Sequence, residues 1–290
     1  MAAERNKPFK NDGTTRGLIY LAGCPIGNLK DVSQRFLEIC NEADIIASED
    51  TRVTGLLLSR LGIKPKRLVS CYSQIEKDEA SKLVKEVYTH DLTLVYMSDA
   101  GMPGISDPGA ILAKEAIDNG VSVSFLPGPC ALIGALIMSG FDTSDFTFYG
   151  FLPAKPNAQK EMLETLKDKK ETLIFYEAPH RIVETLTSMK EVLGEDRRVC
   201  LAREMTKIHE EYIRGTLKEV LELDKDTLRG EFAIVVEGNK EEKVSLSDDD
   251  IVTYAKELLD LGVKKNDVSR YLSEKLKVKK NYIYSLIKDI

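Results

Sequence analysis

The chain has 290 residues, 43% of them hydrophobic and 30% charged, with a formal net charge of −6. This length allows one large domain or two of ordinary size, and the acidic balance means that any nucleic-acid binding must use local basic patches. No apolar run approaches the roughly 18 residues of a membrane span. Residues 1–16 lack the apolar segment of a signal peptide, so we expect a disordered leader there.

Cysteine and histidine usage argues against a metal site. The five cysteines are far apart and never form C-x-x-C, which disfavours both zinc and a disulfide framework. Cysteines in this pattern are typical of a reducing, cytoplasmic protein. Only three histidines are present, without an H-E-x-x-H motif, so we expect no metal.

Residues 17–151 alternate short apolar strands with amphipathic helices, which predicts a mostly parallel α/β domain. Asp31 and Asp107 are expected to be helix N-caps, with Pro108 as the first residue of the second helix. The expected strands are Gly17–Gly23, Ile45–Ala47, Arg67–Ser70, Leu92–Met97, Val121–Leu126 and an edge strand leaving the domain, Phe146–Gly150. The expected helices are Val32–Glu42, a segment around Leu56–Leu58, Glu76–Tyr88, Ala110–Asn119 and Leu132–Ser139.

The stretch Leu92–Gly109 organises this domain. Its apolar strand breaks into a loop rich in glycine and proline, and a second such loop, Pro127–Ala131, follows the next strand. In parallel sheets, loops at the carboxyl ends of strands are where ligands bind, although any βαβ unit also needs glycine turns. The chain has no dinucleotide or P-loop glycine motif, which favours a nucleoside-like ligand without a pyrophosphate.

Residues 152–240 predict a second, smaller α/β domain with a mixed sheet. Its expected strands are Thr172–Tyr176, Arg198–Ala202, an antiparallel Glu210–Arg214 and Phe232–Glu237. Its expected helices are Asn157–Asp168 and one that opens at Glu177–Arg181 and ends at Gly194.

Residues 247–290 predict three short helices in a helix-turn-helix-like extension: Ile251–Leu261, Asn266–Leu276 and Asn281–Ile290. From Lys264 onward, eight basic residues outnumber three acidic ones, and tyrosines stand between them. A basic, aromatic face suits RNA. The solvated surface of a small bundle explains the same pattern equally well.

Eight sequence blocks stand in order along the chain. They are CPIGNLKD (Cys24–Asp31), SEDTR (Ser48–Arg52), SDAGMPGISDPG (Ser98–Gly109), LPGPCA (Leu126–Ala131), GFLPAK (Gly150–Lys155), FYEAPHR (Phe175–Arg181), AREMTK (Ala202–Lys207) and RGEF (Arg229–Phe232). With these blocks, the region Gly17–Gly238 resembles the tetrapyrrole methylase superfamily and, within it, the ribosomal RNA small subunit methyltransferase I family. Cys24 and Met102 depart from the threonines usual or frequent in that family.

The resemblance implies two α/β domains with S-adenosylmethionine in the cleft between them, a small helical extension, and a homodimer. It implies methylation of a cytidine ribose 2′-hydroxyl in the decoding region of 16S ribosomal RNA, with the small ribosomal subunit as partner. Residues at the loops would hold the cofactor: Ile26, Ser98, Asp99, Ala100, Gly101, Pro103, Pro129, Cys130 and Ala131 from the first domain, and Tyr176, Ala202, Arg203, Gly230 and Glu231 from the second.

A 2′-hydroxyl must lose its proton, so a general base is expected. The candidates are Glu49, Asp50, Glu177, His180, Glu204 and Lys207, with Glu49 or Glu204 preferred and Lys207 requiring a lowered pKa. RNA contacts are expected from Arg52, Lys155, Arg181, Lys207, Lys264, Lys265, Lys277, Lys279 and Lys280, and Arg203 could hold phosphate or orient a carboxylate.

Two other functions compete with this one. A precorrin methyltransferase would keep the cofactor and change the substrate, whereas a non-enzymatic RNA-binding assembly factor would keep only the fold. A nicotinamide dehydrogenase is disfavoured because the chain lacks its glycine fingerprint.

Overall fold

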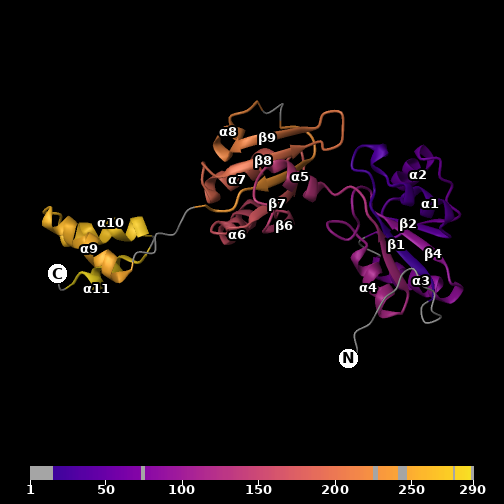
Figure 1. The fold of residues 1–290 in the computed structure, drawn as a ribbon, viewed down its shortest axis with the longest axis horizontal. Helices are drawn as coiled ribbons and strands as arrows, with labels where there is room; N and C mark the ends of the chain where they lie inside the picture. The colour runs from indigo at the N-terminus through magenta and orange to yellow at the C-terminus, as the bar shows by residue number, and fades with distance from the viewer. Residues whose placement is uncertain (1–15, 73–75, 225–227, 241–246, 277, 289–290) are drawn as a thin grey trace. The chain divides into compact units, whose positions relative to one another are not determined.

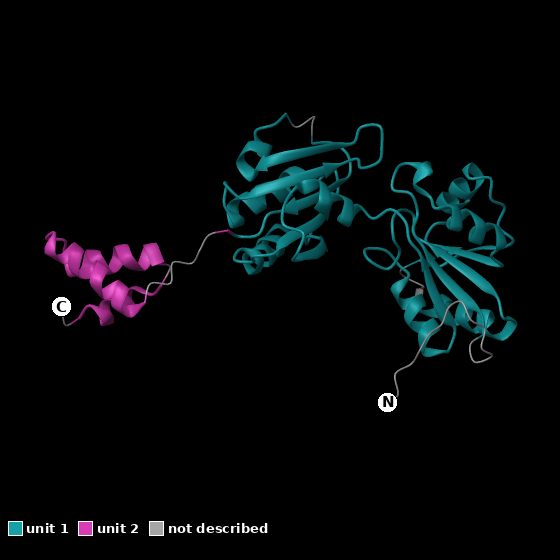
Figure 2. Ribbon diagram, viewed as in Figure 1, with its two compact units in different colours: residues 1–239 teal, residues 240–290 magenta. Residues whose placement is uncertain are grey.

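The computed structural model describes residues 16–72, 76–224, 228–240, 247–276 and 278–288. It forms two compact units, residues 1–239 and 240–290 (Figure 2). The expected leader, except Arg16, lies outside the described residues. No helix in the described part of the chain combines the length and apolarity that crossing a bilayer needs.

The first sheet of unit 1 has five parallel strands in the order β3-β2-β4-β1-β5, as the alternating pattern predicted (Figure 1). The strands are β1 (Leu18–Ala22), β2 (Ile45–Ser48), β3 (Leu68–Ser70), β4 (Thr93–Met97) and β5 (Ser122–Leu126). The helical segments are η1 (Leu29–Asp31), α1 (Gln34–Glu42), α2 (Thr51–Arg60), α3 (Glu76–His90) and α4 (Ala110–Asp118).

Strand β4 is buried on both faces of this sheet. Leu94 and Tyr96 belong to a hydrophobic cluster that includes residues of α3 and α4. Val95 and Met97 point into the opposite cluster, which includes residues of α1 and α2. A continuous apolar run is typical of a strand covered by helices on both sides, so the central strand is confirmed.

The second sheet is mixed, in the order β6-β7-β10-β8-β9. Strands β6 and β7 are parallel, and the other neighbouring pairs are antiparallel. The strands are β6 (Phe146–Phe151), β7 (Thr172–Glu177), β8 (Arg198–Arg203), β9 (Glu211–Thr216) and β10 (Phe232–Val236). The helices are α5 (Ala131–Ser139), α6 (Pro156–Leu166), α7 (Ile182–Leu193) and α8 (Leu217–Leu221). The predicted mixed direction of the second sheet is confirmed.

Two elements expected in the first domain lie with the second sheet. Strand β6 pairs with β7, so it is an edge strand of the second sheet rather than one leaving the first. Leu132 and Leu136 of α5 pack in a cluster with Cys200 and Val235 of the second sheet. The chain therefore passes between the sheets after β5, well before residue 152.

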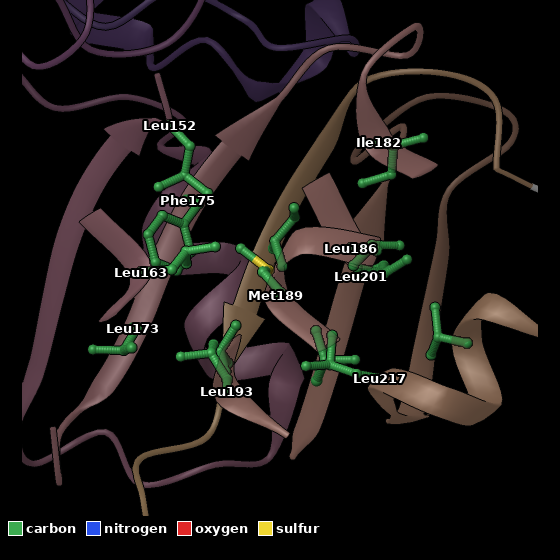
Figure 3. Close-up of a cluster of buried hydrophobic side chains, with 14 of the residues drawn as sticks. Leu152, Leu163, Leu173, Phe175, Ile182, Leu186, Met189, Leu193, Leu201 and Leu217 are labelled. Atoms are coloured by element: carbon green, nitrogen blue, oxygen red, sulfur yellow. The ribbon is translucent and has the colours of Figure 1, made fainter. Parts of the chain in front are cut away.

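The other face of the second sheet carries the hydrophobic cluster of Figure 3. Leu163 of α6 and Met189 of α7 are buried there with Phe175 and Leu201 of the sheet. Burying each such side chain contributes about 1.5–3 kcal/mol. These two covered faces hold the ends of β7, β8 and β10 in fixed positions.

Two predicted helix caps are wrong. Asp31 lies in η1, and Ser33 caps α1 instead by accepting a hydrogen bond from the Phe36 amide at 3.1 Å. Asp107 does not cap α4, because the preceding residue of that helix is Gly109, whose φ of +130° suits glycine. Asp107 therefore lies in the loop that precedes α4.

Unit 2 contains the three expected helices, α9 (Asp248–Asp260), α10 (Lys265–Leu276) and α11 (Lys280–Leu286). Ser247 forms a capping box with Asp250 at the start of α9. The core of this unit consists of Ile251, Ala255, Val268, Leu272, Ile283 and Ile287. This extension therefore has a hydrophobic core of its own.

Candidate active site

The loops that follow β1, β4 and β5 meet at the carboxyl edge of the first sheet. The Cys24 amide donates to the Gly101 carbonyl at 2.8 Å, and the Gly101 amide donates back at 3.1 Å. A Cβ atom added to Gly128 would lie only 2.6 Å from the carbonyl oxygen of Gly23. The β1 and β5 loops therefore touch backbone to backbone, which only glycine allows at this position.

A cavity of about 380 Å³ opens beside these loops, and both sheets contribute to its wall. Its lining is largely apolar, with a few titratable groups. The lining residues are Ile26, Ala100, Gly101, Met102, Ile105, Ser106, Asp107, Cys130, Ala131, Phe151, Tyr176, Glu177, Ala178, Pro179, Ala202, Met205, Lys207, Glu231, Phe232 and Ala233. An apolar cavity with a few polar groups at strand ends is a typical small-molecule site.

Many of the residues predicted from sequence meet in this cavity. Those lining it are Ile26, Ala100, Gly101, Cys130, Ala131, Tyr176, Ala202, Lys207, Glu177 and Glu231. The predicted residues absent from its lining are Ser98, Asp99, Pro103, Pro129, Arg203, Gly230, Glu49, Asp50, His180 and Glu204. Of these, Ser98 supports the loop, because its hydroxyl donates to the Ala100 carbonyl at 3.2 Å.

Several lining residues had not been predicted, chiefly Asp107, Ile105, Phe151 and Met205. Phe151 was missed because β6 was expected to leave the first domain. Asp107 was missed because it was interpreted as a helix cap. A carboxylate within a loop bounded by Gly104 and Gly109 is the signal that could have found it.

The two family departures lie in different places. Cys24 is buried, and its thiol faces the carbonyl of Ala22 at 3.8 Å. Burial raises its pKa to about 12, so this thiol stays protonated. Met102 lines the cavity. Of the two, only Met102 can therefore touch a ligand there.

Lys207 is held by two carboxylates beside the cavity. Its ammonium lies 3.1 Å from Glu204 Oε1 and 2.9 Å from Glu231 Oε2. Burial opposes the charge of Lys207, but the hydrogen bonds to Glu231 and Glu204 raise its pKa overall. Lys207 is therefore a cation at neutral pH and cannot serve as a base.

The carboxylate of Glu204 is also engaged by other groups of the protein. Besides Lys207, its Oε1 accepts a hydrogen bond from the Glu231 amide at 2.9 Å. Burial works against the carboxylate, but the hydrogen bond from Glu231 and the contact with Lys207 leave its pKa lowered. A carboxylate with a lowered pKa is a weak proton acceptor, which makes the preferred base Glu204 unsuitable.

Glu49, the other preferred base, lies at the end of β2. Its amide donates to the Met97 carbonyl at 3.4 Å, and it does not line the cavity. Nearby, Arg52 is exposed over 89% of its side chain and pairs with Asp50 at 2.6 Å. Arg52 is thus accessible to a phosphate group, whereas Glu49 is not at the cavity.

Arg181 is used inside the protein. Its guanidinium donates to the carbonyls of Leu152 at 2.9 Å and Pro153 at 3.1 Å, and it lies 3.6 Å from Glu177. Glu177 also accepts a hydrogen bond from the Thr185 hydroxyl at 2.5 Å. These contacts fix the β6–α6 loop against α7 and leave Arg181 little capacity for RNA.

Tyr176 lies in the cavity wall, next to the start of α5. Its hydroxyl oxygen accepts a hydrogen bond from the Leu132 amide of α5 at 3.1 Å. Its ring packs in T-shaped pairs with Phe148 and Phe151, with centroid separations of 4.8 and 5.9 Å. Burial raises the pKa of Tyr176 to about 12, so the hydroxyl keeps its proton and can donate it to a ligand.

Comparisons with known proteins agree with this arrangement. Residues 18–221 match the family model of Tetrapyrrole (Corrin/Porphyrin) Methylases. The solved structure of the methyltransferase CobJ covers 79% of this chain and 97% of its own, with a TM-score of 0.57 at 16% identity. Diphthine synthase covers 76% and 89%, with a TM-score of 0.56 at 14% identity. The fold is that of the tetrapyrrole methylase class.

Sequence relatives are much more similar. Ribosomal RNA small subunit methyltransferase I of Halalkalibacterium halodurans is 41% identical over 276 residues, 93% of this chain and 94% of the relative. The protein of the same name from Haemophilus influenzae is also 41% identical, over 92% and 95% of the two chains. The chain therefore belongs to the ribosomal RNA small subunit methyltransferase I family, which confirms the resemblance of its sequence blocks.

Proposed function

We propose that this protein transfers a methyl group from S-adenosylmethionine to the 2′-hydroxyl of a cytidine in the decoding region of 16S ribosomal RNA. The observation that carries the proposal is the cavity at the carboxyl edge of the first sheet, in a chain 41% identical to proteins named as small subunit methyltransferases. We also propose that it acts in the cytoplasm on the small ribosomal subunit, as a homodimer.

The cavity suits a nucleoside that carries a sulfonium. Ile26, Ala131 and Ala202 line the cavity and offer an apolar surface for a flat base. Gly101 has a φ of +72°, a conformation in which glycine turns the loop without strain. Asp107 and Glu231 add negative charge opposite a cationic ligand.

The donor supplies, when bound, a methyl group on a positively charged sulfur. Tyr176 can donate a hydrogen bond from its hydroxyl to a ligand in the cavity. The ammonium of Lys207 is paired with Glu204 and Glu231, which leaves it little capacity for a phosphate of the RNA. Apolar walls exclude water from the reacting groups. Positioning of this kind can contribute about 7–11 kcal/mol to catalysis.

One face of unit 2 fits the RNA partner. Lys280 and Tyr284 are four residues apart on α11, both exposed, and so share one side of that helix. Lys288 follows on, and the Lys265 ammonium donates to its carbonyl at 3.0 Å, which brings the start of α10 to the same place. We call Lys265, Lys280, Tyr284 and Lys288 the α11 face. Exposed Lys264 and Lys279 flank it in sequence, and Lys277 lies outside the described residues.

The direct test is label transfer from S-adenosylmethionine to small ribosomal subunits lacking this methylation, with nucleosides identified by mass spectrometry. The proposal predicts 2′-O-methylcytidine, and the label should map to the decoding region. Label in a tetrapyrrole alone would favour the precorrin activity. Absence of cofactor binding by calorimetry would favour an assembly factor. Light scattering should give twice the monomer mass.

Replacing Lys207 with methionine should destabilise the loop that follows β8. The change leaves Glu204 facing Glu231 without their shared cation, and hydrogen bonds to charged groups contribute about 1.5–3 kcal/mol. We expect a loss of this size in the free energy of unfolding by urea. The matched control is Lys218→Met, whose 3.7 Å pair with Glu195 is exposed and should change stability by less than about 0.5 kcal/mol. Equal effects would contradict the assigned role.

A further inference from the structure

The cavity contains three carboxylates, and two of them are already engaged. Glu177 is buried, accepts from Thr185 and the Ala178 amide, and lies near Arg181. Glu231 pairs with Lys207. A base that removes a proton from substrate needs an accessible oxygen without a competing cation.

Asp107 is the carboxylate that meets this requirement. It is accessible to solvent in the cavity wall, and no ion pair of Asp107 is found among the described residues. Its loop is closed by a hydrogen bond from the Gly104 amide to the Pro108 carbonyl at 3.1 Å. Partial burial raises the pKa of Asp107 because it disfavours the charged carboxylate, and the negative charge of Asp99 raises the pKa further. A raised pKa makes a carboxylate a better proton acceptor near neutral pH.

An aromatic surface lies beside the same loop. Ser106 Oγ is 4.0 Å from the position that a Cβ on Gly150 would occupy, so the Asp107 loop runs next to the end of β6. Phe151, the following residue, is 54% exposed and lines the cavity. An exposed ring at a cavity wall is a platform on which a nucleobase stacks.

We propose that Asp107 is the general base for the acceptor hydroxyl and that Phe151 stacks the base of the target nucleotide. This inference rests on the proposed function. The 2′-oxygen forms its bond to the methyl carbon, the carbon–sulfur bond breaks, and the sulfur keeps the electron pair and becomes a neutral thioether. The hydroxyl proton passes to an Asp107 carboxylate oxygen and then to solvent.

The decisive variant is Asp107→Asn, which keeps the shape and removes the proton acceptor. The single-turnover methylation rate should fall by about 10²–10⁴-fold, while calorimetry gives dissociation constants for S-adenosylhomocysteine and for RNA within twofold of wild type. The wild-type rate should decline as the pH falls through the raised pKa of Asp107, and this decline should be absent in the variant. Asp107→Glu should restore this pH-dependent decline.

Other titratable groups lie around Asp107 and can also contribute to the pH profile: Asp99, Cys24, Cys130, Tyr176, Glu177, Lys207 and Glu231.

Phe151→Ala should weaken RNA binding about 5- to 150-fold, the equivalent of one lost stacked base, without changing affinity for S-adenosylhomocysteine. Asp118→Asn, an exposed carboxylate on α4 paired with Lys114, is the matched control.

The outcomes separate the two proposals. A wild-type protein that methylates subunits while Asp107→Asn keeps its rate would overturn the role of Asp107 alone. Loss of S-adenosylhomocysteine affinity in proportion to the rate would reassign Asp107 to cofactor binding. A wild-type protein that binds cofactor but never methylates ribosomal RNA would overturn both proposals.

Discussion

Gly128→Ala is expected to weaken cofactor binding about 5- to 150-fold, although the substitution adds a single methyl group. That methyl would lie 2.6 Å from the Gly23 carbonyl oxygen and 2.8 Å from the Gly23 Cα atom. Because both neighbours are backbone atoms, the loops after β1 and β5 must move apart, and overpacking of this kind costs about 1–3 kcal/mol. Calorimetric titration with S-adenosylmethionine measures the loss directly.

Gly55→Ala is the matched control for this experiment. Gly55 lies inside α2, and its added Cβ would meet its nearest atom, on Leu68, at 3.8 Å, an ordinary contact. Alanine in a helix interior is more stable than glycine by about 0.5–1 kcal/mol. This variant should therefore be slightly stabilised and bind cofactor normally. If Gly128→Ala also bound normally, the contact between the two loops would not shape the site.

Neutralising the α11 face should produce the largest loss of RNA affinity among surface variants. Each phosphate contact to single-stranded RNA contributes about −0.7 to the slope of log K against log salt. Lys280→Gln combined with Lys288→Gln should therefore reduce the magnitude of that slope by about 1.4. Adding Tyr284→Ala should lower affinity further by about 1–3 kcal/mol, the value of one stacking contact.

Filter binding to a ribosomal RNA fragment over a range of salt concentrations measures both quantities. Lys256→Gln on α9 is the matched control, because this exposed lysine belongs to the same unit and not to the α11 face. An unchanged slope in the double variant would exclude this face as an RNA contact. Removal of residues 240–290 without loss of RNA affinity would exclude the whole unit.

Strands in the sheet interior could be predicted because both of their faces are covered by helices, which restricts their side chains to apolar types. Val95 and Met97 lie among residues of α1 and α2 while Leu94 and Tyr96 face α3 and α4, so each of these four positions favours an apolar residue. Loops at the ends of such strands follow from the same pattern, and this is why Ile26, Gly101 and Ala131 could be placed at the cavity.

The partner sheet of α5 could not be predicted from its sequence. The segment Ala131–Ser139 is apolar on every side, so its periodicity does not indicate which face is covered. Only the packing of Leu136 with Cys200 and Val235 decides that it belongs with the second sheet. The edge strand β6 follows α5 in the chain. It was assigned to the first domain together with α5, and that assignment was wrong because the partner sheet of α5 was not known.

Asp107 illustrates a different limit. The order Asp107-Pro108 matches the preferred start of a helix, and local preference favours that interpretation. The backbone turns again at Gly109 before α4 begins, which places the carboxylate in the cavity wall. A two-residue shift of a helix start thus converts a cap into a candidate catalytic group.

The passage of the chain from the first sheet to the second has a thermodynamic consequence. Cys130 and Ala131 line the cavity at the point where α5 begins, so an occupant that fills the cavity touches the connection as well as residues of both halves. A ligand that binds only the intact arrangement stabilises it by about 2.7 kcal/mol at one hundred times its dissociation constant. Saturation with cofactor thus favours melting of the two halves of unit 1 in a single cooperative transition.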